Sequence, residues 1–150
     1  MIVQGVDVVF VGGQIGVESY SYDGALGVAN GWVVTLEETA DAETVGQAVL
    51  DGLASSDQDY AAPESVREGV GSPVASALGL GGFDEMLQAG AHAVSVLRRG
   101  DRLKIQAATT ERFSFGATKD NWKTLLDASS DAVTIGEAVL EARGYCRTEA

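Results

Sequence analysis

The chain is poor in the residue types that most often carry chemistry. It has one cysteine, Cys146, and one histidine, His92, in 150 residues. A single thiol cannot form an intramolecular disulfide, which suits a reducing compartment, and we expect the protein in the cytoplasm. Two such ligands, far apart in the sequence, are too few for a zinc site. We therefore expect no metal and no cofactor.

Basic residues are also scarce. Ten Lys and Arg face 22 Asp and Glu, which gives a net charge of −12. A field of this sign repels nucleic acid and anionic membranes, and it attracts basic partners. The basic residues that do cluster, Arg98, Arg99, Arg102 and Lys104, form a local patch from which we expect no nucleic-acid binding.

Long apolar runs are missing at the N-terminus. It lacks a basic start, and Asp7 and several glycines interrupt its valines, so we expect neither a signal peptide nor a membrane span. The composition is 45% hydrophobic and 21% charged, as in globular proteins. We expect one domain over residues 1–150.

What the sequence does contain is an internal repeat. Residues 32–50 align without a gap to residues 122–140, with 9 of 19 positions identical, among them Trp32 and Trp122. In each copy a β-prone stretch precedes an Asp that suits a helix N-cap, and an apolar stripe with helical spacing follows. The repeat predicts two related halves, each a set of strands followed by one helix.

The first half predicts several antiparallel strands. Residues 2–11 are rich in valine. Residues 17–22 predict a strand in which Tyr20 and Tyr22 alternate with small polar residues, so that one face of the strand meets water. Asp23-Gly24 and Asn30-Gly31 are tight-turn signals. A helix is expected from about Ala42 to Ala54 after Asp41, with Gly46 allowing it to lie close to the sheet.

The middle of the chain predicts a loop and two short helices, and the second half predicts further strands and a closing helix. Residues 55–72 predict a loop, and short helices are expected over 73–80 and 83–89. Strands are expected over 93–97, 103–107, 112–116 and 121–126, and Asp131 caps the closing helix. The fold class is thus α+β, an antiparallel sheet with helices packed on one face, built from two strand-strand-strand-helix halves.

No pattern in the sequence predicts catalysis. No serine lies in a Gly-x-Ser-x-Gly elbow, and the glycine-rich stretches match neither a dinucleotide fingerprint nor a P-loop. His92, standing among alanines, is the only imidazole that could act as a base. We expect no catalytic residue.

The remaining hypothesis is that the protein has a surface that binds another protein. Tyrosine is favoured in interface cores, and acids complement a basic partner. The residues that we expect to contact a partner combine these types: Glu18, Tyr20, Tyr22, Asp23, Asp57, Asp59 and Tyr60. The alternative is that the tyrosines are half-buried strand residues with no contact role.

Three stretches together resemble a known family. They are Ser19 to Gly24, Gly27 to Trp32 and Val45 to Leu50, and they are similar to immunity proteins of bacterial contact-dependent growth inhibition systems. The resemblance covers most of the first 54 residues and the last 30. It implies a cytoplasmic inhibitor that binds the toxin domain delivered by a neighbouring cell, often a nuclease or tRNase, and it carries over no binding residue.

The sequence therefore predicts a non-enzymatic immunity protein that occludes the active site of a cognate toxin, with no nucleic acid, membrane or small-molecule substrate as partner. An acidic protein-binding module such as a secretion chaperone is the alternative. A small hydrolase using His92 is a further one.

Overall fold

The computed structural model describes residues 2–23, 26–56, 72–111, 115–116 and 121–148. Its helices are α1 (Ala42–Ala54), α3 (Pro73–Ala77), α4 (Phe83–Gln88) and α5 (Ala132–Arg143). Its strands are β1 (Val3–Val11), β2 (Gln14–Asp23), β3 (Leu26–Glu37), β4 (His92–Arg99), β5 (Arg102–Ala107), β6 (Thr109–Thr110), β7 (Phe115–Gly116), β8 (Lys123–Asp127) and β9 (Arg147–Thr148).

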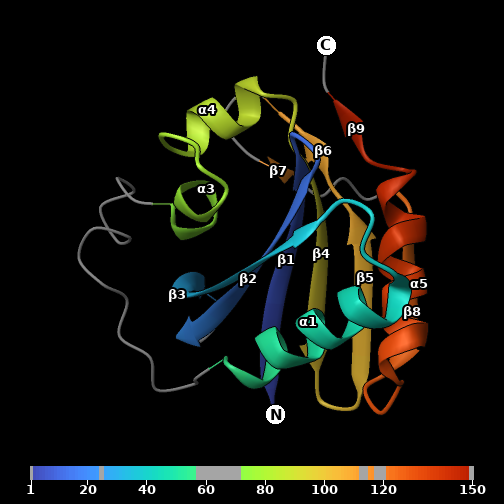
Figure 1. Cartoon of the computed structure of the whole chain (residues 1–150). Coiled ribbons are helices and arrows are strands. Elements are labelled where there is room, and N and C mark those ends of the chain that lie inside the picture. Colours follow the sequence, from blue (N-terminus) through green and yellow to red (C-terminus); the bar gives the residue numbers. More distant parts are fainter. Residues whose placement is uncertain (1, 24–25, 57–71, 112–114, 117–120, 149–150) are drawn as a thin grey trace.

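Six of the strands form one antiparallel sheet in the order β3-β2-β1-β4-β5-β8. The first half supplies β1 to β3 and the second supplies β4, β5 and β8, so the repeated tryptophan strands occupy the two edges (Figure 1). Asp7 lies opposite Ser95 where the two halves meet. This arrangement confirms the α+β class and the two related halves. A small sheet, β7-β6-β9, is added beside them.

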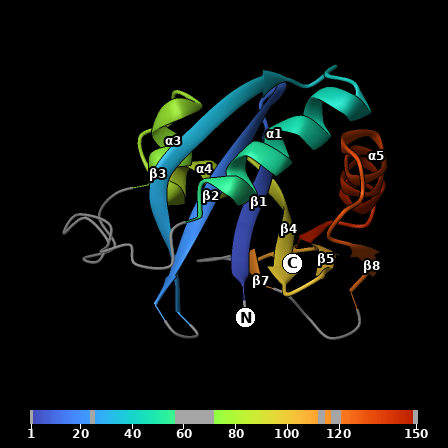
Figure 2. The same cartoon turned by 90° about the horizontal axis from the view of Figure 1, so that it is seen from below.

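The repeated helices α1 and α5 lie side by side on one face of this sheet (Figure 2). Asp41 and Asp131 accept backbone N–H bonds from Thr44 and Thr134, at 2.8 and 2.9 Å, so both helices begin at the predicted caps. The helices bury matched apolar stripes against valines, isoleucines and leucines of β1, β2, β4 and β5. The predicted bounds of α1 are confirmed.

The repeated glycines have a role that differs from the predicted one. We expected Gly46 to bring its helix close to the sheet, but it lies where α1 crosses α5. A Cβ on Gly46 would stand 1.7 Å from the carbonyl oxygen of Ala132, and one on Gly136 would stand 1.7 Å from that of Ala42. The glycines therefore let the two helix backbones touch each other.

Two short helices cover part of the opposite face. α3 and α4 pack on Val9, Val33 and Ala93, whose side chains point away from α1 and α5. Ser72 caps α3 through the backbone N–H of Ala75, and Pro73 opens that helix. Because α3 and α4 are short, they cover only one end of this face, and no other described helix covers the rest of it.

The Asn30-Gly31 pair does not form the predicted turn. It lies inside β3, where the register against β2 shifts and Gly31 adopts a φ of +91°. The side-chain amide of Asn30 donates to the hydroxyls of Ser19 and Ser21 and to the carbonyl of Ser55, at 3.0 to 3.1 Å. A glycine with positive φ serves a β-bulge as readily as a turn, which explains the wrong prediction.

The expected wet face of β2 is also corrected. Ser19 and Ser21 are fully buried under α1, where Ser19 donates to the carbonyl of Gly52 at 2.7 Å. The tyrosines Tyr20 and Tyr22 point to the opposite face and are half-buried. The small residues face inward because the close approach of α1 leaves space only for small side chains with hydrogen-bond partners.

Some predicted features fall outside the described residues. These are most of the loop over 55–72, the Gly24 turn and most of the strand over 112–116, of which Phe115 and Gly116 form β7. Within the described residues no helix is long and apolar enough to cross a membrane.

Candidate functional site

The open end of the second sheet face holds two adjoining hollows, each of about 260 Å³. The first, which we name the acid–tyrosine hollow, is lined by Asp7, Tyr20, Tyr22, Gly27 and Ser95, together with Val6 and Val96. The second, which we name the basic groove, is lined by Leu97, Arg99, Arg102, Lys104 and Leu125. Strand β4 contributes to both hollows, so they form one continuous surface.

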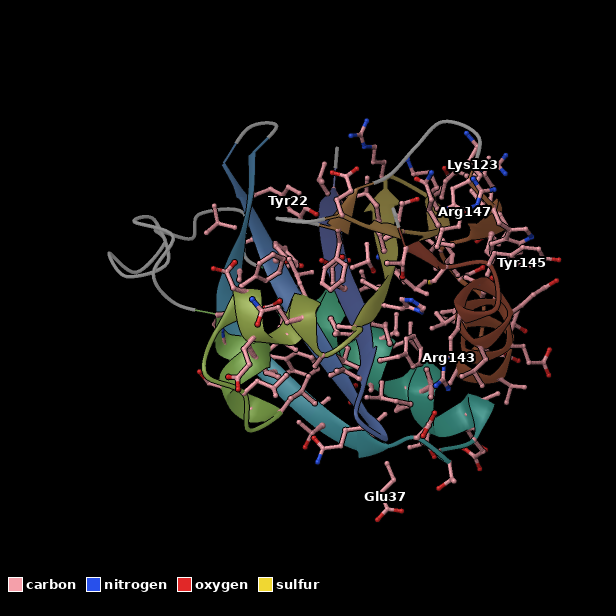
Figure 3. The ribbon with its side chains drawn as sticks, turned by 90° about the horizontal axis from the view of Figure 1, so that it is seen from above. Tyr22, Glu37, Lys123, Arg143, Tyr145 and Arg147 are labelled. Atoms are coloured by element: carbon pink, nitrogen blue, oxygen red, sulfur yellow. The ribbon has the colours of Figure 1, made fainter. Side chains whose placement is uncertain are left out.

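Tyr22 owes its position to two glycines. A Cβ on Gly5 would lie 2.0 Å from the Tyr22 hydroxyl oxygen, and a Cβ on Gly27 would lie 2.7 Å from the edge of its ring. Any larger residue at either position would displace the ring. β1 and β3 thus hold Tyr22 flat across β2, where it forms part of the wall of the hollow. Figure 3 shows Tyr22 well apart from Lys123, which begins the edge strand β8, and from Arg147 in the small sheet.

Buried acids lie beside the tyrosines. Tyr20 donates to the Glu18 carboxylate at 3.5 Å, and Asp7 shares the same tyrosine hydroxyl. Burial raises the pKa of Asp7 to about 6, although the bond from Tyr20 acts to lower it. Burial and then the charge of Asp7 raise the pKa of Glu18 to about 7. The charge of Asp7, followed by burial, raises the pKa of Tyr20 well above its usual value.

The structure brings together three of the residues that we expect to contact a partner. Glu18, Tyr20 and Tyr22 lie in a row along β2, with Glu18 4% exposed beneath α3 and the tyrosines half-exposed. Asp23 ends β2, but its side chain lies outside the described part. Asp57, Asp59 and Tyr60 also fall outside it. A role in partner binding stays a prediction for all seven.

Sequence reasoning missed Asp7, which the structure places at the centre of this cluster. The signal was available, because Asp7 is the one charged residue within a run of valines, where each neighbour points into a core. It was interpreted only as a break in an apolar run. An acid in a central strand belongs to whichever face of the sheet lacks a covering helix, and that face could not be assigned before the topology was known.

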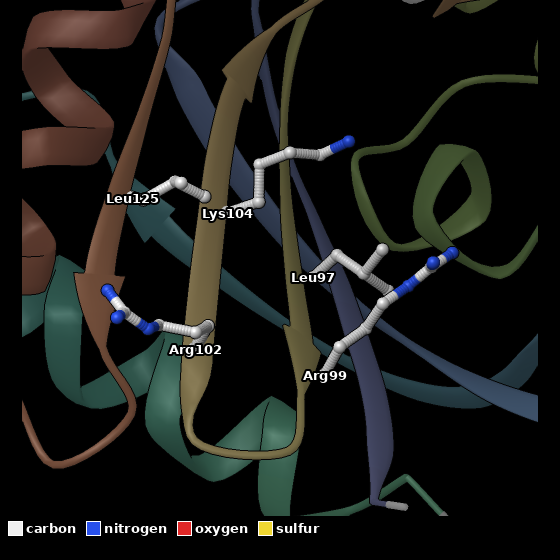
Figure 4. Close-up of a pocket in the computed structure, with 5 residues that line it drawn as sticks. All are labelled: Leu97, Arg99, Arg102, Lys104 and Leu125. Carbon is white, nitrogen blue, oxygen red and sulfur yellow. The ribbon is translucent and has the colours of Figure 1, made fainter.

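The basic groove has a different chemistry. Arg99, Arg102 and Lys104 extend from β4 and β5, and Leu97 and Leu125 lie on either side of Lys104 (Figure 4). Leu125 is 62% exposed. Arg99 also lies near Tyr22 of the neighbouring hollow. Burial and the charge of Asp7 raise the pKa of Tyr22, and the charge of Arg99 acts to lower it. The open face therefore changes from acidic to basic across β4.

Exposed acids cluster on the opposite side of the molecule, over the helices. Glu43 and Asp51 on α1 and Glu137 and Glu141 on α5 face solvent, and Glu37 and Glu38 follow at the end of β3. Arg143 pairs with Glu38 and stacks over the Phe10 ring at 4.6 Å. These six exposed carboxylates thus lie on the helical side of the molecule, away from the basic groove.

The residues suited to catalysis are engaged elsewhere. His92 Nε2 lies 3.1 Å from the hydroxyl of Thr148, and Cys146 donates to backbone carbonyls of Ala93 and Ala142. Burial raises the pKa of the Cys146 thiol, which disfavours a reactive thiolate. In the described residues no group of His, Cys, Asp and Glu could hold a metal ion.

Comparison with known proteins identifies the fold. No protein-family model matches the sequence, and no curated protein matches it. A solved structure of a protein of unknown function from Neisseria meningitidis superposes with a TM-score of 0.78 at 19% identity, covering 97% of this chain and 96% of that chain. A chain of the CdiA-CT/CdiI toxin and immunity complex from Yersinia pseudotuberculosis superposes with a TM-score of 0.78 at 14% identity, covering 98% of this chain and 99% of that chain. At the level of fold, the resemblance to immunity proteins of contact-dependent growth inhibition is thereby confirmed.

Proposed function

We propose that the chain is an immunity protein that binds a cognate toxin domain in the cytoplasm and neutralises it by covering the active site. One observation carries the proposal. The fold matches a chain of a toxin and immunity complex from end to end, with 98% of this chain and 99% of the other aligned.

The charge distribution supports a basic, nucleic-acid-cleaving toxin as the target. An enzyme that binds phosphate presents Lys and Arg at its active site, and a protein of net charge −12 is attracted to such a surface. Opposite charges also raise the association rate and select the partner.

The test pairs this protein with a toxin domain encoded immediately upstream of its gene. We expect the two to co-elute in size exclusion, and we expect the toxin's nuclease activity to fall to background at equimolar inhibitor. A toxin domain from an unrelated system is the control and should remain active. Steering by charge also predicts slower association at high salt.

Two outcomes would overturn the proposal. Failure to co-elute and failure to protect cells that express the toxin would remove the immunity role. Co-elution with undiminished toxin activity would instead support the secretion chaperone, which holds its partner without inhibiting it.

A further inference from the structure

The basic groove is at odds with the overall charge of the protein. Three cations, Arg99, Arg102 and Lys104, gather on two neighbouring strands of a chain that carries −12. They lie next to one another because Arg99 pairs with Arg102 across the β4–β5 hairpin, and Lys104 follows on the same face two residues later. Like charges placed so close repel each other, so the arrangement lowers the stability of the isolated sheet.

Within the described residues none of the three cations forms an ion pair. Asp127 lies opposite Arg102 in the register. The pKa of its carboxylate is lowered mainly by the bonds that it accepts from the hydroxyl and the backbone N–H of Ser129, at 2.7 and 2.8 Å, and to a smaller extent by the charge of Arg102. Asp101, in the β4–β5 turn, is exposed and likewise forms no ion pair with the described groove residues. Within the described residues no carboxylate thus neutralises the groove by direct contact, and its cations can meet an anionic group from outside.

The apolar walls restrict the kind of anion. Leu97 and Leu125 flank Lys104 on the two neighbouring strands, and Arg99 and Arg102 form the next pair along the sheet. Leu125 is 62% exposed. Single-stranded nucleic acid is held by aromatic side chains on which its bases stack, and among the described residues no aromatic side chain lines this groove. An apolar side chain packed on the two leucines and on the aliphatic stem of Lys104, with carboxylates near the two arginines, matches the surface better. The groove therefore fits a protein segment in which acids flank a residue such as leucine.

We propose that the basic groove docks an acidic segment of the toxin, carrying one apolar side chain that packs on Leu97 and Leu125. This inference rests on the proposed immunity function and adds the orientation of the partner. The basic catalytic surface of a toxin is repelled by the groove, so it cannot bind there, while a local acidic segment can. The groove thereby fixes which way round the two proteins meet.

The experiment measures the dissociation constant of the toxin complex for four proteins. They are the wild type, a groove variant (Arg99→Gln, Arg102→Gln, Lys104→Gln), an apolar variant (Leu125→Ser) and a charge control (Thr39→Glu, Gln88→Glu, Val133→Glu). The control adds three negative charges at exposed positions outside the groove, so it shifts the net charge by as much as the groove variant does. All substituted side chains are exposed or half-exposed, and circular dichroism confirms that each variant folds.

We expect the groove variant to bind about 10- to 100-fold more weakly and Leu125→Ser about 5- to 10-fold more weakly. The charge control should bind a basic toxin as well as the wild type does or better. If the wild type binds the toxin and the groove variant binds equally well, the groove is not a contact and the inference fails while the immunity function stands. If the wild type does not bind, the proposed function itself fails. Binding of a single-stranded oligonucleotide by the wild type, lost in the groove variant, would assign the groove to nucleic acid and overturn the inference.

Discussion

The contact between α1 and α5 leads to a prediction that opposes ordinary helix propensity. Replacing glycine by alanine inside a helix usually stabilises it by about 1 kcal/mol. At Gly46 the new methyl group would stand 1.7 Å from the carbonyl oxygen of Ala132, a backbone atom that cannot rotate away. Relief requires the two helices to separate over the shared core, and overpacking of this kind costs about 1–3 kcal/mol. We expect Gly46→Ala to lower the free energy of unfolding by up to about 2 kcal/mol net, where helix propensity alone would raise it.

Urea titration followed by circular dichroism measures this change. Gly144→Ala is the matched control, because Gly144 ends α5 in right-handed helical geometry and its Cβ would meet only Glu141 O at 3.4 Å. That variant should gain about 0.4–1 kcal/mol. The double variant Gly46→Ala/Gly136→Ala should lose less than the two single losses combined, because either methyl group alone already separates the helices. Equal or greater stability of Gly46→Ala than of wild type would refute the direct backbone contact.

Three further predictions concern buried polar groups and the edge of the sheet. Asn30→Ala should cost about 2–4 kcal/mol, because it removes the bonds that Asn30 donates to the buried Ser19 and Ser21 and leaves the backbone N–H of Trp32 without its acceptor. Thr35→Ala, exposed on the same strand, should change stability by less than about 0.5 kcal/mol in the same titration. Asp7 and Glu18 hold protons more tightly when folded, with pKa values of about 6 and 7, so the stability they contribute is present below about pH 4 and is lost as the pH rises through 6 to 7. Glu18→Gln should reduce this loss of unfolding free energy between about pH 4 and 7 by on the order of 1–3 kcal/mol. An unchanged dependence of stability on pH would show that Glu18 does not titrate in that range. Tyr145→Ala should redshift the fluorescence of Trp122, whose ring stacks on Tyr145 at 5.4 Å, and a spectrum identical to wild type would contradict the stacking.

The features predicted from sequence are those that local chemistry decides. Asp41 and Asp131 cap their helices because a carboxylate before an apolar helical stripe satisfies free backbone N–H groups wherever it occurs. The repeat around Trp32 and Trp122 likewise predicted two equivalent helices, since equal sequences bury equal stripes. Both tryptophans pack against the same core, at opposite edges of the sheet.

The features that sequence could not predict depend on which strands become neighbours. Gly46 could have faced either the sheet or the other helix until the crossing of α1 and α5 was known. The basic residues were visible as a cluster, but the approach of Leu125 to Lys104 follows from the pairing of β5 with β8. The inward position of Ser19 depends on Asn30, eleven residues away across a bulge. Strand pairing is a property of the whole sheet, so no short window contains it.

The near twofold relation of the two halves has a consequence for how such a protein can change. The layer in which the halves agree, with its caps and crossing glycines, lies on one side of the sheet. Across the sheet the halves differ completely, since Asp7 and Tyr22 stand in one and Arg102 and Leu125 in the other. Substitutions at half-exposed positions there disturb little of the shared core. Substitutions on the open sheet face can therefore change what that face binds while the repeated helical layer stays as it is.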